Sequence, residues 1–395
     1  MAGEWFNVML GDVVTLQRGF DLPSQKRKPG KVPIVSSSGI SDYHSEVGVA
    51  GPGVVTGRYG TIGQVFLIKE DYWPLNTTLW VKDFHGNDPQ FASYLLRTVD
   101  FHSCSDKSSV PGVNRNDLHR IPVLLPPLAE QKAIAQILGA LDDKIELNRR
   151  MNATLEAMAR ALFQSWFVHF DPARAKLDGR QPAGLDADTA ALFPDHFQES
   201  LLGHIPQGWA AGTVSEGFNL TMGQSPPGNT YNEEGSGLPF YQGRTDFGFR
   251  FPSRRIYCTA PTRYANPGDT LVSVRAPVGD INMADEECCI GRGVAAVRHK
   301  SGATSFTYHA MANLEPDFAK FEAEGTVFGS INKQSFENLH FVIPPPQVIA
   351  AYEQQAAPLD EQIRTLEHQS RTLATLRDAL LPKLLSGKLP ISLVN

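Results

Sequence analysis

The stretch "LPPLAEQKAIAQILGALDDKIE" at Leu125–Glu146 is nearly repeated as "IPPPQVIAAYEQQAAPLDEQIR" at Ile343–Arg364. A proline pair opens each copy, and an apolar pattern with helical spacing follows it. The proline pairs (126–127 and 344–345) and the Leu-Asp pairs (141–142 and 359–360) have the same offset, since 344 − 126 = 218 and 359 − 141 = 218. A constant offset over that distance indicates a duplicated unit. The sequence therefore predicts two equivalent long helices.

The repeat extends upstream of these helices. "SVPGVNRNDLHRIPVLLPP" resembles "TVFGSINKQSFENLHFVIPPP", with Asn114 matching Asn332. Further upstream, "GPGVVTGRYGTIG" resembles "NPGDTLVSVRAPVGD", with Arg58 against Arg275. Between these matches the two halves diverge. A shared frame with a divergent interior is expected of two domains that have one architecture and two different targets.

The first helix, expected at about 128–168, can be divided into heptads. Its a positions, and those of the second helix at the same offset, are Ile134, Leu141, Asn148, Leu155, Leu162 and Tyr352, Leu359, Leu366, Leu373, Leu380. The d positions are Ile137, Lys144, Met151, Met158, Ser165 and Gln355, Gln362, Gln369, Leu376, Lys383. Apolar a positions over five heptads predict that the helices pair, with the polar Asn148 fixing their register. The alternative is two ordinary amphipathic surface helices.

Each globular half has a mixed pattern. "GVVTG", "GQVFLI", "TLWVKDF", "DTLVSV" and "GVAAVRH" are typical of strands, whereas "PQFASYLLRTVD" and "TSFTYHAMANLE" are typical of helices. The segment 171–200 is rich in Pro, Gly, Ala and Asp and is interpreted as a connector that spans a long distance. We expect globular domains at 1–125 and 206–343, helical spacers at 126–170 and 344–395 (the latter with a tail), and a connector at 171–205.

The composition describes an ordinary soluble protein. The 395 residues carry a net charge of −6, and 42% of them are hydrophobic. The N-terminus does not resemble a signal peptide, and no apolar run approaches the ~20 residues of a membrane helix. The four cysteines form no CxxC pair. A reduced, cytoplasmic protein is the expected class.

The motifs of catalysis are missing from the sequence. We find no phosphate-binding loop, no dinucleotide fingerprint, no HExxH or GxSxG motif, and no Asn-Pro-Pro-aromatic run of an amino-methyltransferase. Isolated histidines such as His119 and His169 are interpreted as core or surface residues rather than metal ligands. The sequence therefore predicts no catalytic or metal site in this chain.

The duplicated halves, the proline starts, "LDDKIELNRRMNATLEAMARALFQSWF" and the closing "LLPKLLSGKL" resemble the specificity subunit of type I DNA restriction–modification systems. "SSSGISDYH", "GPGVVTGRYGTIGQVF" and "WPLNTTLWV" resemble a common first recognition domain of that family. The resemblance implies a non-catalytic, DNA-binding subunit. It also implies two adenine-methyltransferase partners that use S-adenosylmethionine, and nuclease-translocase partners that use ATP, with Mg on the partner subunits.

The resemblance implies an α+β fold. Two globular mixed α/β target-recognition domains would be separated by two long helices packed as an antiparallel coiled coil, with pseudo-twofold symmetry. About 40 residues per helix give ~60 Å of spacer. Two different domains would recognise an asymmetric bipartite DNA target, because the strands of DNA are themselves related by a twofold axis. The alternative is a structural adaptor whose halves bind protein.

Candidate DNA-binding residues follow from the chemistry of base recognition, in which Arg binds guanine and Asn or Gln binds adenine. Residues 238–264 hold five arginines, one acid and six interleaved aromatic residues. The candidates in the two halves are Lys26, Arg27, Lys28, Ser36, Ser37, Ser38, Arg58, Tyr59, Thr61 and Gln242, Arg244, Arg250, Arg254, Arg255, Arg275. For the loop at 26–28 the alternative is a solvated run of surface charge, and for the second half it is a surface strand with snorkelling arginines. Arg58 and Arg275 would form either a shared phosphate contact or a shared structural salt bridge. Candidate partner-binding residues, taken as exposed apolar side chains, are Trp166, Phe167, Leu384 and Leu385.

Overall fold

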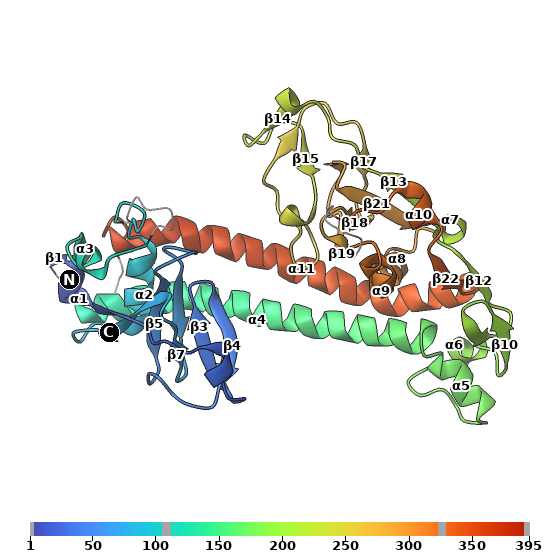
Figure 1. Cartoon of the computed structure of the whole chain (residues 1–395), viewed down its shortest axis with the longest axis horizontal. Helices are drawn as coiled ribbons and strands as arrows, with labels where there is room; N and C mark the ends of the chain where they lie inside the picture. The colour runs from blue at the N-terminus through green and yellow to red at the C-terminus, as the bar shows by residue number, and fades with distance from the viewer. Residues whose placement is uncertain (1–3, 105–111, 323–328, 391–395) are drawn as a thin grey trace. The chain divides into compact units, whose positions relative to one another are not determined.

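The computed structural model describes residues 4–104, 112–322 and 329–390 (Figure 1). It divides into two compact units. The first unit comprises Met1–Leu147 and Gln369–Asn395, and the second comprises Asn148–His368. The upstream parts of the repeat at 109–111 and 326–328 lie outside the described residues. Each long helix therefore begins in one unit and ends in the other.

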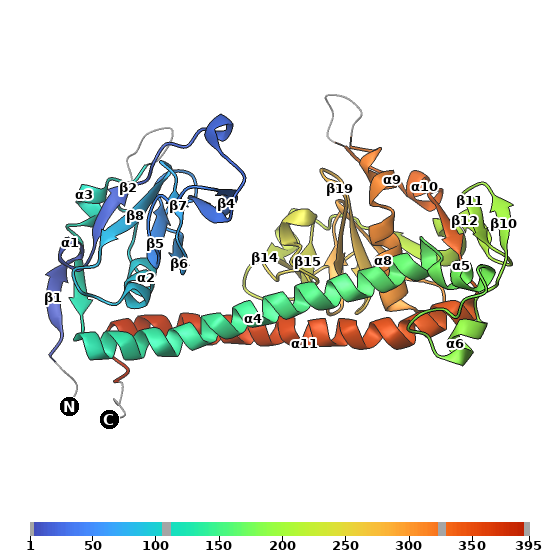
Figure 2. The same cartoon turned by 90° about the horizontal axis from the view of Figure 1, so that it is seen from below.

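The first unit contains a four-stranded antiparallel sheet in the order β2-β8-β5-β6. Its elements are β1 (Phe6–Met9), α1 (Leu10–Val13), β2 (Thr15–Arg18), η1 (Ser24–Lys26), β3 (Val32–Ser36), β4 (Gly39–His44), β5 (Gly53–Gly57), β6 (Val65–Ile68), β7 (Trp73–Pro74), β8 (Thr78–Asp83), α2 (Pro89–Arg97), α3 (Arg115–Leu118), β9 (Pro122–Leu125) and the start of α4 (Leu128–Phe167). In Figure 2, α2 lies between this sheet and α4.

The second unit repeats that sheet in the order β13-β21-β18-β19. Its elements are α5 (Asp171–Leu177), α6 (Ala187–Ala191), β10 (Phe197–Ser200), β11 (Gly203–Pro206), β12 (Ala210–Thr213), α7 (Val214–Gly217), β13 (Phe218–Met222), η2 (Gly228–Thr230), β14 (Tyr231–Asn232), β15 (Leu238–Tyr241), η3 (Arg244–Asp246), β16 (Tyr257–Cys258), β17 (Tyr264–Ala265), β18 (Thr270–Val274), β19 (Val278–Met283), β20 (Cys288–Ile290), β21 (Val294–His299), α8 (Thr304–Asn313), α9 (Glu315–Ala319), α10 (Lys333–Glu337), β22 (His340–Ile343) and the start of α11 (Pro346–Leu385).

A second, smaller sheet also recurs in both units. In the first unit β3 pairs with β7 in parallel, and in the second unit β15 pairs with β20 in parallel. The antiparallel pair β1–β9 corresponds to β12–β22. The structure thus confirms the duplication that the sequence predicts, together with the predicted strands β5, β6, β8, β18 and β21 and the predicted helices α2 and α8.

Two of the sequence matches have the same structural cause in each copy. Asn114 and Asn332 each cap a short helix: their side-chain oxygens accept hydrogen bonds from the backbone N–H groups of Asn116 (3.0 Å) and Ser335 (2.9 Å). Asn is a preferred N-cap because it satisfies a donor that the helix cannot. The proline pairs precede α4 and α11, where a fixed φ and a missing N–H suit a helix start.

The two long helices pack antiparallel within each unit. In the first unit Arg377 of α11 binds Asp142 of α4 at 2.7 Å. In the second unit Asn152 donates to Glu367 at 2.9 Å, and the side-chain amide of Asn148 lies 3.5 Å from the carbonyl oxygen of Leu366. Asn148 and Leu366 are equivalent residues of the repeat (366 − 148 = 218). The predicted helix pairing is confirmed.

The predicted d positions are wrong. Ile137, Met151 and Met158 are exposed by 40%, 38% and 53%. The second buried stripe lies four residues after each a position and contains Leu138, Ile145, Asn152, Ala159, Ala356, Ile363 and Leu384. The a positions Ile134, Asn148 and Leu366 are buried, and Leu141, Leu155, Leu162, Leu359, Leu373 and Leu380 are half-buried. Of the polar residues at predicted d positions, Gln362, Gln369 and Lys383 are exposed, and Lys144, Ser165 and Gln355 are half-buried.

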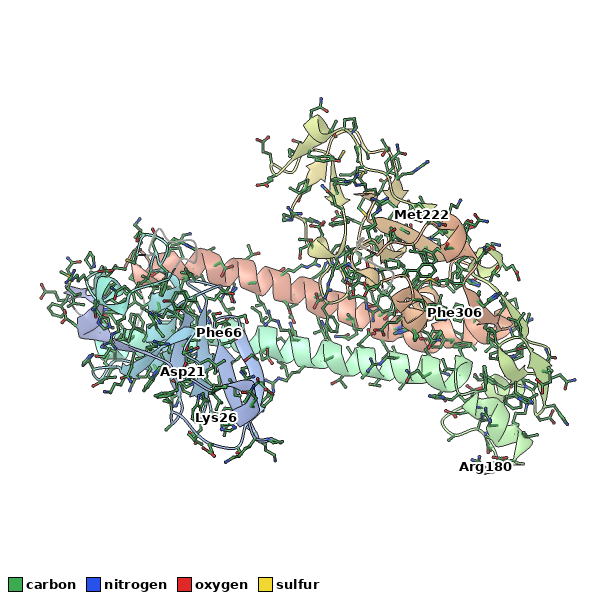
Figure 3. The ribbon with its side chains drawn as sticks, viewed as in Figure 1. Asp21, Lys26, Phe66, Arg180, Met222 and Phe306 are labelled. Atoms are coloured by element: carbon green, nitrogen blue, oxygen red, sulfur yellow. The ribbon has the colours of Figure 1, made fainter. Side chains whose placement is uncertain are left out.

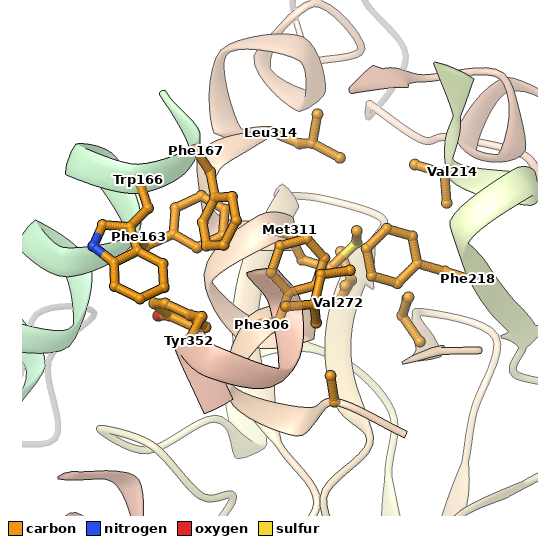
Figure 4. Packing of buried hydrophobic residues seen from close by; sticks show 14 of the residues in the cluster. Phe163, Trp166, Phe167, Val214, Phe218, Val272, Phe306, Met311, Leu314 and Tyr352 are labelled. Atoms are coloured by element: carbon orange, nitrogen blue, oxygen red, sulfur yellow. The ribbon is translucent and has the colours of Figure 1, made fainter. Parts of the chain in front are cut away.

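The helices also complete the hydrophobic core of each unit. Trp166 and Phe167 of α4 pack with Tyr352 of α11 and Phe306 of α8 (Figure 4). In the first unit Ile134, Leu138, Leu384 and Leu385 belong to the core that includes the sheet strands and α2. Each helix segment therefore packs on two sides, against the other helix and against a globular domain. The domain boundaries at 125, 170, 205 and 343 stay a prediction.

The predicted connector is folded rather than extended. It forms α5, α6 and the hairpin β10–β11. Phe193 and Ile205 are almost fully buried in the core of the second unit. Among the Pro, Gly and Asp residues that suggested a long connector, Asp186 caps a helix: it accepts a hydrogen bond from the N–H of Thr189 at 2.8 Å.

The repeated Leu-Asp pair provides an equivalent anchor in each unit. Asp142 accepts hydrogen bonds from Tyr94 (2.7 Å) and Arg97 (3.1 Å) of α2, and Arg97 lies over the ring of Tyr94. Burial would raise the pKa of Asp142, but Arg377, Tyr94 and Arg97 together hold it below its ordinary value. The anchor thus fastens α2, and with it the sheet, to α4.

Asp360 forms the corresponding anchor in the second unit. It accepts a hydrogen bond from Arg250 at 2.7 Å, and Arg250 also binds Glu156 of α4. The guanidinium lies over the ring of Tyr308 of α8, 3.9 Å from its centroid. In both units an arginine stacked on a tyrosine therefore binds the aspartate of the repeat. This contact explains why the Leu-Asp pair recurs at the constant offset.

Candidate nucleic-acid interface

A basic pocket of about 460 Å³ opens in the second unit. It lies where the loops after β13, β15, β18 and β20 meet. The lining residues are Ser225, Gln242, Gly243, Arg244, Thr245, Asp246, Arg255, Arg275, Ala276, Pro277, Arg292 and Gly293. The structure thus brings together four of the six candidates that the sequence predicts in this half: Gln242, Arg244, Arg255 and Arg275. Four arginines against one acid make the pocket strongly positive.

The acid of the pocket holds two of the candidates in place. Asp246 is buried, and its Oδ1 accepts hydrogen bonds from Nε and Nη2 of Arg255 at 3.2 and 3.1 Å. Its Oδ2 accepts from the backbone N–H of Gln242 at 3.2 Å. The side chains of Gln242 and Arg255 are exposed at the pocket. A single carboxylate therefore holds the backbone of Gln242 and the guanidinium of Arg255 in place.

The remaining arginines of the pocket differ in their partners. Arg244 pairs with Asp280 at 3.0 Å. Arg275 and Arg292 are exposed and form no ion pair within residues 4–104, 112–322 and 329–390. Such unpaired guanidinium groups are suited to phosphate, which attracts Arg and Lys irrespective of base sequence.

Sequence reasoning missed Arg292, although "GRG" at 291–293 carries a signal. A Cβ atom on Gly293 would lie 2.2 Å from the carbonyl oxygen of Gln242. Glycine at that position lets the β20–β21 loop approach the loop after β15, and the approach brings Arg292 into the pocket. An arginine between two glycines is therefore a sequence pattern that could have predicted Arg292 as a pocket residue.

Two predicted readers lie outside the pocket, and for Arg250 the prediction is wrong. Its side chain is only 1% exposed, because it is paired with Glu156 of α4 and Asp360 of α11. Burial lowers the pKa of Arg250, but Tyr308, Asp360 and Glu156 raise it above its ordinary value, so the group stays charged. Arg254 is exposed and pairs with Glu286 rather than lining the pocket.

The candidates of the first unit lie in the corresponding loops. Ser36 ends β3, the counterpart of β15, and Arg58 follows β5, the counterpart of β18. A Cβ atom on Gly60 would lie 3.4 Å from Oγ of Ser37, so the turn at Ser36–Ser38 adjoins the loop of Arg58, Tyr59 and Thr61. Arg58 lies over the ring of Tyr59 at 4.5 Å. The two halves thus present candidates from equivalent strand ends.

The predicted match of Arg58 to Arg275 is off by one residue. Tyr59 pairs with Gly112, and Arg275 pairs with Ser330. Gly112 and Ser330 are themselves equivalent, because their numbers differ by the offset of the repeat (330 − 112 = 218). Tyr59 is therefore the structural counterpart of Arg275. A phosphate contact or salt bridge shared by both arginines is not supported.

The basic loop at Lys26–Lys28 is tied to β4. Arg27 pairs with Asp42 at 3.0 Å and Lys28 with Glu46 at 2.8 Å. Lys26 is exposed (Figure 3) and forms no ion pair in the part of the chain that the structure describes. Lys26 is the residue of this loop with a charge left for a ligand.

The predicted partner-binding residues are wrong, because their side chains are buried within this chain. Trp166, Phe167, Leu384 and Leu385 are 2%, 7%, 2% and 7% exposed. Leu128 at the start of α4 is exposed, and further along the helix the exposed large apolar side chains are Ile137, Leu147, Met151 and Met158. We call these four residues the α4 apolar stripe. At the equivalent positions α11 carries Gln355, Thr365, Gln369 and Leu376.

Other kinds of site are not found among the described residues. No group of three or more His, Cys, Asp or Glu could hold a metal ion there. All four cysteines are free thiols. Within those residues, no helix is both long and apolar enough to span a membrane.

Comparison with known proteins gives one consistent result. The family model "Type I restriction modification DNA specificity domain" matches residues 2–157 and 206–373, once in each half. The putative type I restriction enzyme MjaX specificity subunit of Methanocaldococcus jannaschii is 27% identical over 314 residues, covering 77% of this chain and 69% of the relative. The HindI specificity subunit of Haemophilus influenzae is 24% identical over 365 residues, covering 76% and 77%.

A solved structure shares the fold. The S subunit of a type I restriction–modification system from M. genitalium superposes with a TM-score of 0.62 at 16% identity, covering 97% of this chain and 96% of that one. At this identity the likeness concerns the fold alone.

Proposed function

The chain belongs to the family of type I restriction–modification DNA specificity subunits, and from that premise we propose how it recognises its target. As a member of this family the chain is a non-catalytic DNA-recognition subunit. Each domain would bind one half of an asymmetric bipartite target through the loops at the strand ends described above. The gathering of Gln242, Arg244, Arg255, Arg275 and Arg292 around one pocket carries the proposal.

The partners complete the proposal. Two adenine-methyltransferase subunits that use S-adenosylmethionine would bind one copy of this chain in the cytoplasm. Nuclease-translocase subunits that use ATP and Mg would then join the complex. The α4 apolar stripe is the exposed apolar surface that suits a methyltransferase helix, since exposed apolar patches commonly mark protein interfaces.

Coexpression with the methyltransferase partner tests the proposal. Sequencing of methylated adenines should yield one motif with two different half-sites and a fixed gap, whereas the chain alone should transfer no labelled methyl group. Binding of the complex to DNA should weaken steeply with salt, because each phosphate contact contributes about −0.9 to the slope of log K against log salt. Salt-independent binding without sequence preference would favour the protein-binding adaptor instead.

A further inference from the structure

We infer that Asp246 orients Arg255 to recognise a guanine in the second half-site, while Arg275 and Arg292 bind the phosphate backbone. The inference rests on the proposed function and deepens it, because it names a base and the residue that would select it. Asp246 would act as a positioning residue and would not itself contact DNA.

The geometry of the Arg255–Asp246 pair carries the first part. Nε and Nη2 of Arg255 both bind one oxygen of Asp246. The edge of the guanidinium that contains Nη1 and the second N–H of Nη2 is therefore directed away from the carboxylate. Two parallel N–H groups on that edge match O6 and N7 of guanine in the major groove. Of the Arg255 side chain 54% is exposed, whereas Asp246 is only 2% exposed.

Asp246 is itself held firmly. Its second oxygen accepts from the N–H of Gln242, and its backbone carbonyl accepts from the N–H of Ser253 at 2.8 Å. The latter bond ties the segment just before Arg255 to the same residue. A reader held in place before binding loses less conformational entropy when it meets its base. Arg244 lacks such support, because its partner Asp280 is 37% exposed.

Arg275 and Arg292 differ from Arg255 in having no ion pair within the described residues. In the part of the chain that the structure describes, no carboxylate pairs with their guanidinium groups to orient them. Exposed positive charges beside an oriented base-reading arginine suit backbone phosphates, which fix the register of the protein on DNA without selecting sequence. The pocket would thus combine one selective contact with two contacts that do not depend on sequence.

The test uses the full chain in complex with its methyltransferase partner and duplexes that vary each base pair of the mapped target. For Arg255→Lys, discrimination for guanine at one position of the second half-site should fall about 5- to 150-fold. The salt dependence of DNA binding and the base preference at the first half-site should be the same in this variant as in the wild type. For Arg292→Gln, all sequences should weaken alike, with a salt slope shallower by about 0.9. Arg263→Lys, an exposed arginine of the same domain outside the pocket, is the matched control and should change neither.

Asp246→Asn should reduce discrimination for guanine at the same position of the second half-site as Arg255→Lys does. If that variant does not fold, Arg255→Lys decides, since Arg255 lies outside the core. Equal weakening of every sequence by Arg255→Lys would make Arg255 a phosphate contact and overturn the inference. An unchanged base preference would overturn it too, while the proposed function would survive if the wild-type complex still selects its target. A wild-type complex without sequence preference would overturn both.

Discussion

At the scale of single residues, His119 shows how burial defines a role that its sequence position does not reveal. The backbone N–H of Leu16 donates to Nε2 of His119 at 2.9 Å, so that nitrogen must be unprotonated. Burial, and then the charges of Arg115 and His85, lower the pKa of His119. The ring therefore acts as a neutral hydrogen-bond acceptor at the start of β2.

The stability of the first unit should consequently decrease in mild acid. Above the unfolded pKa of about 6.5 the ring is neutral in both the folded and the unfolded chain, so it does not make the free energy of unfolding depend on pH. Below it the unfolded chain binds a proton that the folded ring resists, so the free energy of unfolding falls until the folded ring protonates. Denaturant titrations between pH 7.5 and 5 should show this slope. His119→Gln, which keeps an acceptor but does not titrate, should flatten it; an equal slope in both proteins would exclude His119 as the cause.

At the scale of elements, the two anchors use the same chemistry at different depths. The Arg250 side chain is 1% exposed, whereas that of Arg97 is 28% exposed. Removing one partner of a buried ion pair leaves the other charge uncompensated and costs about 3–5 kcal/mol. A pair that water still reaches contributes about 1 kcal/mol or less.

Arg250→Met should therefore lower the free energy of unfolding of the second unit by about 3–5 kcal/mol, and Arg97→Met should lower that of the first unit by about 1 kcal/mol or less. Hydrogen exchange resolved along the chain can follow the two units separately. Neither variant should alter the bases of the methylated motif. A stable Arg250→Met protein with a changed base preference would restore Arg250 as a DNA reader.

The repeat made much of the fold predictable, because its constant offset implies equivalent strands, caps and helices. It could not give the phase of the heptads. A helix covered by a partner helix on one side and a domain on another has an apolar face wider than one seam, so two registers fit the pattern equally well. For the same reason Trp166 looked like a surface anchor although it is a core residue.

Candidate site residues were harder to predict than elements. Arg250 and Arg255 belong to one arginine-rich stretch, and their difference depends on partners that the stretch does not contain. Glu156 and Asp360, which bury Arg250, lie 94 and 110 positions away along the chain. Composition identifies the arginine-rich stretch. Only tertiary contacts distinguish the buried structural Arg250 from the exposed arginines beside it.

At the scale of the whole molecule, the paired helices are expected to set the gap of the DNA target. Inserting four residues near Asn148 and four near Leu366 adds ~6 Å to each helix. Because these equivalent residues face each other, the matched insertions keep the helices in register. The gap in the methylated motif should grow by about one to two base pairs at ~3.4 Å each, with both half-sites unchanged. An unchanged gap in an active complex would mean that the helices do not determine spacing.

The two methyltransferase-binding surfaces that we propose should also differ in the strength with which they bind. α4 exposes Ile137, Leu147, Met151 and Met158, whereas the equivalent residues of α11 are mostly polar. A loss of about 1.4 kcal/mol of apolar contact weakens binding tenfold. Titration with methyltransferase should therefore give two steps separated by more than about tenfold. Met151→Gln with Met158→Gln should weaken the tighter step; a single step of two equal sites in the wild type would contradict this expectation.

Unequal docking has a consequence for the living cell. When methyltransferase is scarce, each chain would bind one copy at its tighter surface before any chain binds two, so the half-loaded complex would dominate. Full complexes then accumulate only after the supply of methyltransferase exceeds that of this chain. The ratio of the two gene products, rather than the amount of either, would thus govern how soon a newly arrived system begins to mark its host's DNA. The α4 apolar stripe, a few exposed methionine and aliphatic side chains, would thus influence when methylation of the DNA begins.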